Sequence, residues 1–377
     1  MSELPLTTSR DAENGDRPRD GTGLCLSGGG YRAMLFHTGA LWRLYEVDLL
    51  RNVRRISSVS GGSIIAGVLA LNWNRLSFDP SRLKSDFVPL VVAPVRSFAS
   101  HTIDVGAVLK GLLLPGRASS RIARAYNRYL FHGVTLQNLP DQPRFVINAT
   151  NLQSGVLCRF SKPFMWDYRV GMIANPNVPL ATAVAASSAF PPFLSPLVLK
   201  FMNSDFVPDT GNDLQREPFT TRMVLTDGGV YDNLGLETVW KNYKTVLVSD
   251  GGGGFSPKEK PAGDWLLQSY RVLNVIDNQV RSLRKHQVVE SYVSGTRTGA
   301  YWGIRTHIDH YPQPGPLKCP YDHTIKLAET PTRLKRLDDK LQERLINWGY
   351  AVCDAAVRSH VLPNPGKPEF PYPDVEV

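Results

Sequence analysis

A serine beside two glycines is the residue best placed to do chemistry in this chain. Ser60 stands in the segment Ser58–Gly62 (SVSGG), between an apolar run and a helix-like run. A serine at a sharp strand-to-helix turn exposes its hydroxyl at the edge of a sheet, and the following helix N-terminus favours negative charge nearby. The usual form of this turn is Gly-x-Ser-x-Gly, and Ser58 occupies the first glycine position. The pattern predicts a nucleophile at Ser60, with an ordinary Ser-Gly turn as the alternative.

A run of three glycines is the second feature. Gly28–Gly30 follows a short apolar run and precedes another helix-like segment. Backbone N–H groups of such a loop can bind an anion, which suits an oxyanion or a phosphate. The spacing to Ala33 also fits the dinucleotide fingerprint Gly-x-Gly-x-x-Ala. That fingerprint needs an acidic residue at the end of the next strand, ~20 positions on. Glu46 and Asp48 fall in or just after the helix, so dinucleotide binding is the weaker alternative.

A carboxylate is the third feature. Asp227 ends an apolar run and precedes Gly228 and Gly229. Flanking glycines allow such a carboxylate to approach a second loop and act as general base to a serine, and partial burial would raise its pKa toward that task. The alternative is an aspartate that ends a strand and caps the next helix. Asp250 has the same form and competes with Asp227.

Histidines and cysteines carry no comparable pattern. A Ser–Asp–His order could use His286, His307 or His323, but nothing distinguishes any of them. The four cysteines are scattered, without Cys-x-x-Cys or Cys/His ligand spacing, and we therefore expect reduced thiols and no metal site. They are Cys25, Cys158, Cys319 and Cys353.

The elements that must position these residues alternate between strand and helix. Strands are expected at 24–27 and 56–59, and each runs through a glycine turn into a helix. This order is typical of an α/β sheet with functional loops at the carboxyl ends of its strands. Further strands are expected at 144–149, 222–226 and 245–249, and further helices at 234–240 and 332–358.

Composition limits the classes of protein. The 377 residues are 42% hydrophobic and 20% charged, which is typical of a globular chain. The apolar runs are far shorter than the ~20 residues that span a bilayer. Residues 1–21 are polar without an apolar core, so we expect a flexible segment rather than a secretory signal, and a cytoplasmic protein.

The formal charge of +9 favours anionic partners. Residues 81–144 hold nine Lys and Arg against three Asp, beside the apolar runs 88–95 and 109–114. We interpret this segment as a helical cap with a solvated basic face, or one that contacts an anionic membrane surface. In the second case, binding to anionic vesicles would weaken with salt. No basic stripe with interleaved aromatics supports a nucleic-acid partner.

Taken in order, these motifs resemble those of the patatin-like phospholipase and lipid acyl hydrolase family, in its bacterial form. Residues 28–32 (GGGYR) resemble its anion-binding loop, residues 58–62 its nucleophile elbow, and residues 227–229 (DGG) its dyad aspartate. The segment 228–235 (GGVYDNLG) is an especially close match. The resemblance covers about residues 22–250.

The resemblance implies a three-layer α/β/α patatin-like sandwich with a mostly parallel central sheet. A single catalytic domain would span residues 22–360. It would include the cap at about 81–144 and a C-terminal helical extension at about 255–360. A Pro-rich tail would follow at 361–377.

The resemblance also implies a Ser–Asp dyad that uses no histidine, metal or cofactor. Asp227 would take the proton of Ser60, and Ser60 would form an acyl-enzyme with an ester of a phospholipid or related lipid. The family context favours Asp227 over Asp250. The expected oxyanion donors are Gly28, Gly29, Gly30 and Gly61, and the expected supporting residues are Arg32, Gly62, Gly228 and Gly229. The alternative is a non-catalytic module that binds an anionic lipid or ligand through the glycine loop and the basic cap. The residues do not indicate an oligomeric state.

Overall fold

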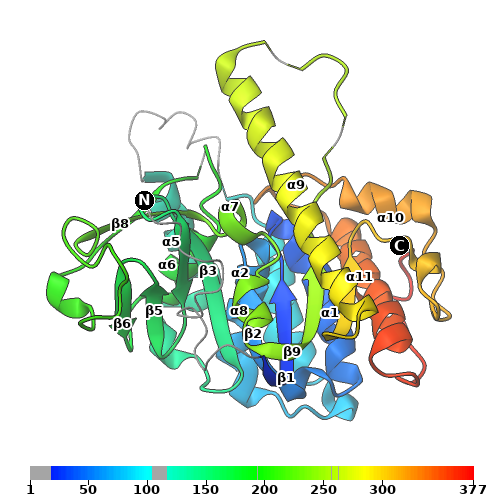
Figure 1. Cartoon of the computed structure of the whole chain (residues 1–377). Coiled ribbons are helices and arrows are strands. Elements are labelled where there is room, and N and C mark those ends of the chain that lie inside the picture. The colour runs from blue at the N-terminus through cyan, green and yellow to red at the C-terminus, as the bar shows by residue number, and fades with distance from the viewer. Residues whose placement is uncertain (1–17, 104–116, 193, 256, 262) are drawn as a thin grey trace.

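The computed structural model describes residues 18–103, 117–192, 194–255, 257–261 and 263–377 (Figure 1). Its strands are β1 (Arg19–Leu26), β2 (Val53–Ser58), β3 (Arg144–Asn151), β4 (Val156–Phe160), β5 (Phe164–Asp167), β6 (Gly171–Ala174), β7 (Leu197–Lys200), β8 (Arg222–Asp227), β9 (Tyr243–Asp250) and β10 (Thr298–Gly303). Its α-helices are α1 (Gly30–Glu46), α2 (Gly61–Asn72), α3 (Ala93–Ala99), α5 (Arg117–Tyr126), α6 (Leu180–Ser187), α7 (Gly229–Asp232), α8 (Glu237–Trp240), α9 (Trp265–Val293), α10 (Tyr321–Ala328) and α11 (Asp339–His360).

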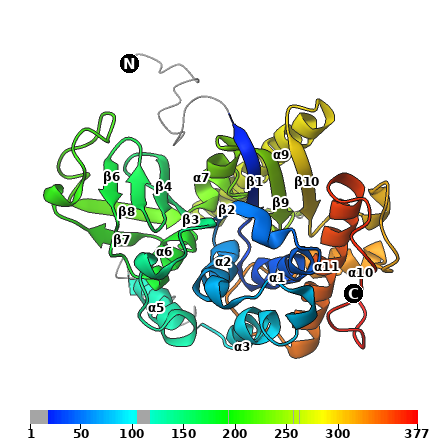
Figure 2. The same ribbon diagram turned by 90° about the horizontal axis from the view of Figure 1, so that it is seen from below.

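All ten strands join one sheet, whose main path runs β10-β9-β1-β2-β3-β4-β5-β6. Pairing is parallel from β10 to β3 and antiparallel beyond β3, where β8 also pairs with β3. Helices α1, α2 and α11 cover one face of the parallel strands, and α7 and α9 lie on the other (Figure 2). The expected three-layer α/β fold is confirmed, with parallel pairing confined to the part of the sheet from its edge strand β10 to β3.

The C-terminal extension is an integral part of this domain. Its strand β10 lengthens the sheet beside β9, and its helix α11 packs against α1. The two helices touch through glycines, because a Cβ at Gly349 would lie 1.9 Å from the Phe36 carbonyl oxygen. A buried ion pair between Arg43 and Asp354, at 2.7 Å, adds a polar link between the same helices.

The last long helix begins later than the sequence indicated. Asp338 accepts a hydrogen bond from the Leu341 N–H at 2.9 Å and so caps α11, which starts at Asp339 rather than at 332. The residues before it run across α3, where the Leu337 N–H donates to the Ala99 carbonyl. Hydrophobic spacing continued through this segment, so the pattern alone did not show the break.

The apolar run 88–95 of the cap contributes to the hydrophobic core. It forms a π-helical turn at Val88–Val92 and the start of α3, and Val91, Val92 and Val95 are fully buried. These three valines are therefore unavailable for contact with a membrane surface, which was one of the two interpretations of this segment. The second run, 109–114, lies outside the described residues. On α5, Arg121 and Arg124 are exposed.

Both ends of the described chain are tied to the body. The strand β1 starts at Arg19, whose N–H donates to the Asn242 carbonyl, so residues 19–21 do not belong to the expected flexible segment. Residues 1–17 of that expectation lie outside the described residues. In the tail, the Tyr372 carbonyl accepts from Asn347 at 2.8 Å, and the Tyr372 ring packs edge-on against Trp42. Across the part of the chain that the structure describes, no helix is both long and apolar enough to cross a membrane.

We expect Gly349→Ala to destabilise the domain strongly, because the added methyl overlaps the α1 backbone; overpacking of this kind costs ~1–3 kcal/mol or more. Thermal unfolding measures the change. Gly263→Ala is the control, because a Cβ there meets no atom within 4 Å. An equal melting temperature for Gly349→Ala and the wild type would show that the helices do not pack as described.

Candidate active site

Strand register brings Ser60 and Asp227 to the same level of the sheet. Ser58 of β2 pairs with Ile147 of β3, and Ala149 of β3 pairs with Asp227 of β8. Ser60 lies two residues beyond Ser58, just as Ala149 lies two residues beyond Ile147. Because β8 runs antiparallel to β3, Asp227 reaches this level from the opposite direction. The Ser60 hydroxyl lies beside the Asp227 carboxyl, near enough to lower the pKa of that carboxyl through hydrogen bonding.

The backbone at Ser60 is strained. Its φ of 50° and ψ of −116° are values that residues with side chains rarely adopt. The turn is held there by close backbone contacts, since a Cβ at Gly62 would lie 2.3 Å from the Leu26 carbonyl oxygen. Ser60 remains partly exposed while its neighbours are buried. The hydroxyl is thus presented at the carboxyl end of β2, as expected for a nucleophile elbow.

A network of serines accommodates Ser58 in place of the usual glycine. The Ser63 hydroxyl donates to Ser58 Oγ at 3.0 Å and lies 2.9 Å from Ser187 Oγ. Ser187 Oγ in turn accepts the Ser60 N–H at 2.9 Å. The Ser58 side chain is fully buried, and its hydroxyl is satisfied within this network. The departure from the glycine pattern therefore leaves the elbow intact.

Burial shapes the chemistry of Asp227. Removal from water raises the pKa of its carboxyl to about 7, although hydrogen bonds from the Gly229 N–H and the Ser60 hydroxyl favour the ionised form. The Gly229 N–H donates to Oδ1 at 2.7 Å. Gly228 passes close to the backbone of β3, where a Cβ would meet the Asn148 carbonyl oxygen at 2.3 Å. Asp227 is therefore suited to exchange a proton near neutral pH.

The glycine loop lies directly against the elbow. A Cβ at Gly61 would lie 2.2 Å from the Gly30 carbonyl oxygen, so the two turns are in backbone contact. Gly30 and Gly61 are the first residues of α1 and α2, and their N–H groups have no acceptor within their own helices. Gly29 precedes Gly30 with a φ of 147°. These three residues lie where N–H groups could meet an oxyanion formed at Ser60.

Gly28 was expected to donate its N–H to an oxyanion, but in the structure this N–H has other acceptors. Its N–H donates to the backbone oxygen of Asn233 at 3.1 Å and to the Asn233 side-chain oxygen at 3.2 Å. This donor is already used, so Gly28 anchors the loop rather than offering a hydrogen bond. Sequence reasoning did not assign Asn233 a role, although it stands within the segment 228–235 that carried the resemblance.

Arg32 links the glycine loop to two neighbouring segments of the chain. Its guanidinium is buried and donates to the carbonyl oxygens of Gly251 and Thr330. Burial lowers the pKa of Arg32 to about 10, which still leaves it charged at neutral pH. Arg32 thus ties the loop to the end of β9 and to the segment before α11, as expected of a supporting residue.

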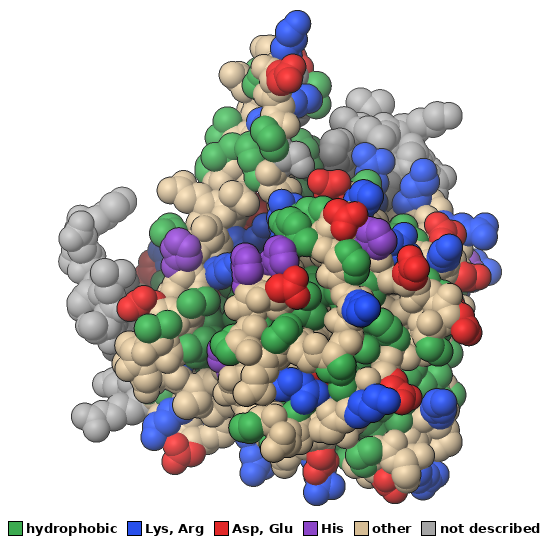
Figure 3. All heavy atoms as spheres, turned by 90° about the vertical axis from the view of Figure 1, so that its right-hand side faces the viewer, with side chains coloured by type: hydrophobic (Ala, Val, Ile, Leu, Met, Phe, Trp, Pro, Cys, Tyr) green, Lys and Arg blue, Asp and Glu red, His purple; other side chains and the backbone are tan. Residues whose placement is uncertain are grey.

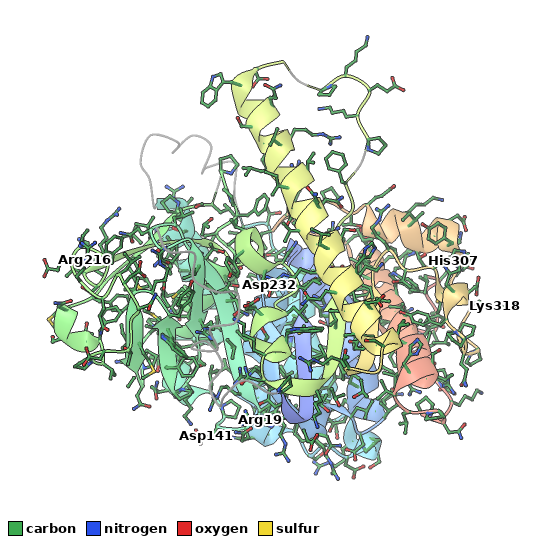
Figure 4. The ribbon with its side chains drawn as sticks, in the orientation of Figure 1. Arg19, Asp141, Arg216, Asp232, His307 and Lys318 are labelled. Carbon is green, nitrogen blue, oxygen red and sulfur yellow. The ribbon has the colours of Figure 1, made fainter. Side chains whose placement is uncertain are left out.

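The competing candidate Asp250 and the nearby Asp232 have other partners. Asp250 accepts hydrogen bonds from Ser27 at 3.3 Å, from the Gly252 N–H at 2.9 Å and from the Tyr301 hydroxyl at 2.8 Å. Asp232, labelled in Figure 4, lies on α7 beside α9 and accepts the Glu237 N–H at 2.7 Å. Both aspartates therefore stabilise the backbone and side chains around the site.

The histidine and nucleotide alternatives find no support in the described residues. The ring of His307 stacks on that of His310, and His323 bonds to the Val377 carbonyl. His286 is exposed on α9. Glu46, the acidic residue a dinucleotide would need, pairs with Arg43 at the far end of α1 from the glycine loop. Nowhere in the described chain do three or more His, Cys, Asp or Glu side chains form a group that could hold a metal.

We expect Asp227→Asn to stabilise the protein at pH 8. The folded state holds the Asp227 proton up to about pH 7, whereas the unfolded chain releases it near pH 4. The free energy of unfolding therefore decreases as the pH rises from about 4 to about 7. Neutral asparagine avoids this loss, and its advantage should shrink as the pH is lowered from 8 to 5. Thermal unfolding at both values measures it. Asp141→Asn, at a carboxylate with 86% exposure (Figure 4), is the control. A lower melting temperature for Asp227→Asn at pH 8 would contradict the burial argument.

Comparison with known proteins agrees with this geometry. Over 180 residues the chain is 29% identical to triacylglycerol lipase ptl2 of Schizosaccharomyces pombe, covering 47% of this chain and 26% of the lipase. It is 29% identical over 234 residues to triacylglycerol lipase 4 of Saccharomyces cerevisiae, covering 56% and 22%. The chain therefore spans about a quarter of the length of these relatives.

Among solved structures, human GIVD cytosolic phospholipase A2 shares the fold, with a TM-score of 0.51 and 12% identity. The match covers 90% of this chain and 58% of that enzyme. The family model for patatin-like phospholipases matches residues 24–240, which contain the glycine loop, the elbow and Asp227. The chain belongs to the patatin-like phospholipase family.

Proposed function

We propose that this protein is a serine hydrolase that cleaves carboxylic esters of lipids through Ser60 and Asp227. The observation that carries the proposal is the approach of a partly exposed, strained serine to a buried carboxyl, whose removal from water raises its pKa to about 7. A buried carboxyl whose pKa is strongly raised and which lies beside a serine hydroxyl is a candidate for a functional group.

The geometry supports a two-step reaction. Asp227 in its ionised form accepts the Ser60 proton as Ser60 Oγ bonds to the ester carbonyl carbon. N–H groups of Gly29, Gly30 and Gly61 are placed to stabilise the oxyanion. Collapse of this intermediate breaks the bond to the leaving alkoxide, which takes the proton from Asp227 and leaves an acyl-enzyme. Water then attacks the acyl carbonyl carbon while Asp227 takes one of its protons. Collapse of this second intermediate breaks the bond to Ser60 Oγ, which takes the proton back from Asp227, and the carboxylic acid leaves.

Lipid esters are the substrate class that the surroundings favour. Val230 lies three residues after Asp227, and Phe190 follows Ala189, whose carbonyl accepts the Asp227 N–H; the two side chains are 49% and 36% exposed. Apolar side chains beside a nucleophile suit acyl chains better than charged substrates. The names of the matched relatives and of the family point to triacylglycerols and phospholipids. Burial of both Ser60 and Asp227, or a separation far beyond hydrogen-bond reach, would favour the alternative of a non-catalytic binding module. Asp227 is buried, but Ser60 is partly exposed and its hydroxyl affects the pKa of Asp227.

We expect Ser60→Ala and Asp227→Asn each to reduce ester hydrolysis by at least ~10³-fold, because each removes an essential part of one dyad. The assay uses a soluble short-chain ester and a phospholipid, with thermal unfolding to confirm that both variants fold. Asp141→Asn should keep wild-type rates. Hydrolysis at the wild-type rate by either dyad variant would exclude the proposed mechanism.

We expect kcat/KM for a soluble ester to rise with pH through one ionisation near pH 7, since only ionised Asp227 can accept the serine proton. Below that value the carboxyl is protonated and the rate should fall about tenfold for each unit of pH. A rate that stays constant from pH 5 to pH 8 would show that Asp227 is not the base.

A further inference from the structure

Helix α9 exposes apolar side chains to solvent, whereas a helix packed on a protein body normally buries them. Trp265, Val272, Ile276 and Leu283 recur at helical spacing on one face and are 77%, 50%, 50% and 61% exposed. We call these four residues the outer stripe. They extend for about 27 Å along the helix. Leu273, Val275 and Val280 nearby are also at least 36% exposed.

The opposite face of α9 is polar and is turned toward the catalytic end. Asn233 donates to Asp277 at 3.5 Å, Arg281 bonds to the Gly253 carbonyl, and Arg284 pairs with Glu237 at 2.9 Å. This reverses the usual arrangement, in which an amphipathic helix buries its apolar side. The reversal implies that the outer stripe has a partner other than the body of the protein.

The carboxyl-terminal part of α9 is anchored in the body of the protein. Val288 is buried in a cluster with β9, and the Tyr292 hydroxyl donates to the Val246 carbonyl at 2.6 Å. The amino-terminal part projects beyond the body on the side of the carboxyl ends of the parallel strands (Figure 1). Hydrophobic side chains are visible along this projection (Figure 3).

We propose that the outer stripe of α9 docks onto a lipid surface and so holds the active site against its substrate, an inference that rests on the proposed function. An apolar face ending in tryptophan, with arginines on the polar face, is typical of helices that lie at a membrane surface. Exposed Lys258 and Lys260 flank Glu259 in the loop before the helix, where cations favour phosphate headgroups.

The placement of the helix links docking to catalysis. Tyr270 on α9 packs edge-on against Phe190 at 6.3 Å, and Phe190 follows Ala189, whose carbonyl accepts the Asp227 N–H. Because Tyr270 lies on the opposite face of α9, a lipid surface on the outer stripe would be one helix diameter, ~10 Å, from the exposed apolar residues next to the dyad. A second copy of this chain is the other occupant that the stripe could accept.

The test compares two double variants on the same helix. Val272→Gln/Ile276→Gln interrupts the outer stripe, whereas Val289→Gln/Val293→Gln replaces exposed valines at the anchored end, and glutamine preserves helix formation in both. Each pair is introduced into the Ser60→Ala protein, and co-sedimentation with phosphatidylcholine vesicles is measured, with and without phosphatidylglycerol, at low and high salt.

We expect the stripe variant to lose vesicle affinity by roughly tenfold or more, while the control pair binds like the parent. Parent binding to phosphatidylcholine should persist at high salt, because apolar contact carries it. Unchanged binding by the stripe variant would overturn the proposal. The proposal would also be overturned if the parent protein did not bind vesicles but formed a dimer, as measured by light scattering, and if the stripe variant did not form that dimer.

Activity measurements separate this proposal from the proposed function. With Ser60 present, the stripe variant should hydrolyse a soluble ester at the wild-type rate and a vesicle-borne ester more slowly. If the wild type hydrolyses neither ester, the proposed function fails, and the vesicle measurements still decide whether the stripe docks. If soluble ester is hydrolysed and the stripe variant attacks vesicles as fast as wild type, only the docking proposal fails.

Discussion

The backbone contact between two glycine turns is the constraint on which the rest of the site depends. Gly61 of the elbow approaches Gly30 of the loop so closely that neither turn could move without the other. This contact brings the Ser60 hydroxyl and the first N–H groups of α1 and α2 into one small region. Only parallel neighbouring strands, β1 and β2, both followed by helices on the same face, can bring two such turns together.

The surrounding frame keeps this contact in place through buried polar groups. Arg32 ties the loop to β9, Asn233 fixes Gly28, and the serine network supports the Ser60 N–H. Each of these groups would be costly to leave unpaired in the interior, so the frame resists the relaxation of a strained serine. Helix α9 adds Asp277 near Asp227, and its charge raises the pKa of Asp227 further.

The three motifs and the two strand–turn–helix units could be predicted from the sequence because their signals are local. Glycines, a serine and an aspartate stand directly at element ends, where spacing is informative. The pairing of Asp227 with Ser60 depended on the antiparallel register of β8 on β3, which no local pattern encodes. The use of the Gly28 N–H by Asn233 is likewise a contact between residues 205 positions apart. Apolar spacing did not show whether a segment is buried: the run 88–95 lies in the core, and the outer stripe of α9 faces solvent.

The central claim is that Ser60 is the nucleophile and needs no metal. Intact-mass and peptide analysis after reaction with a long-chain alkyl fluorophosphonate tests it most directly, since this reagent captures an activated serine. We expect one adduct per chain, on the peptide that contains Ser60, formed equally fast with and without chelator and absent from Ser60→Ala. An adduct on another residue, or one that forms only when divalent metal is supplied, would contradict the account.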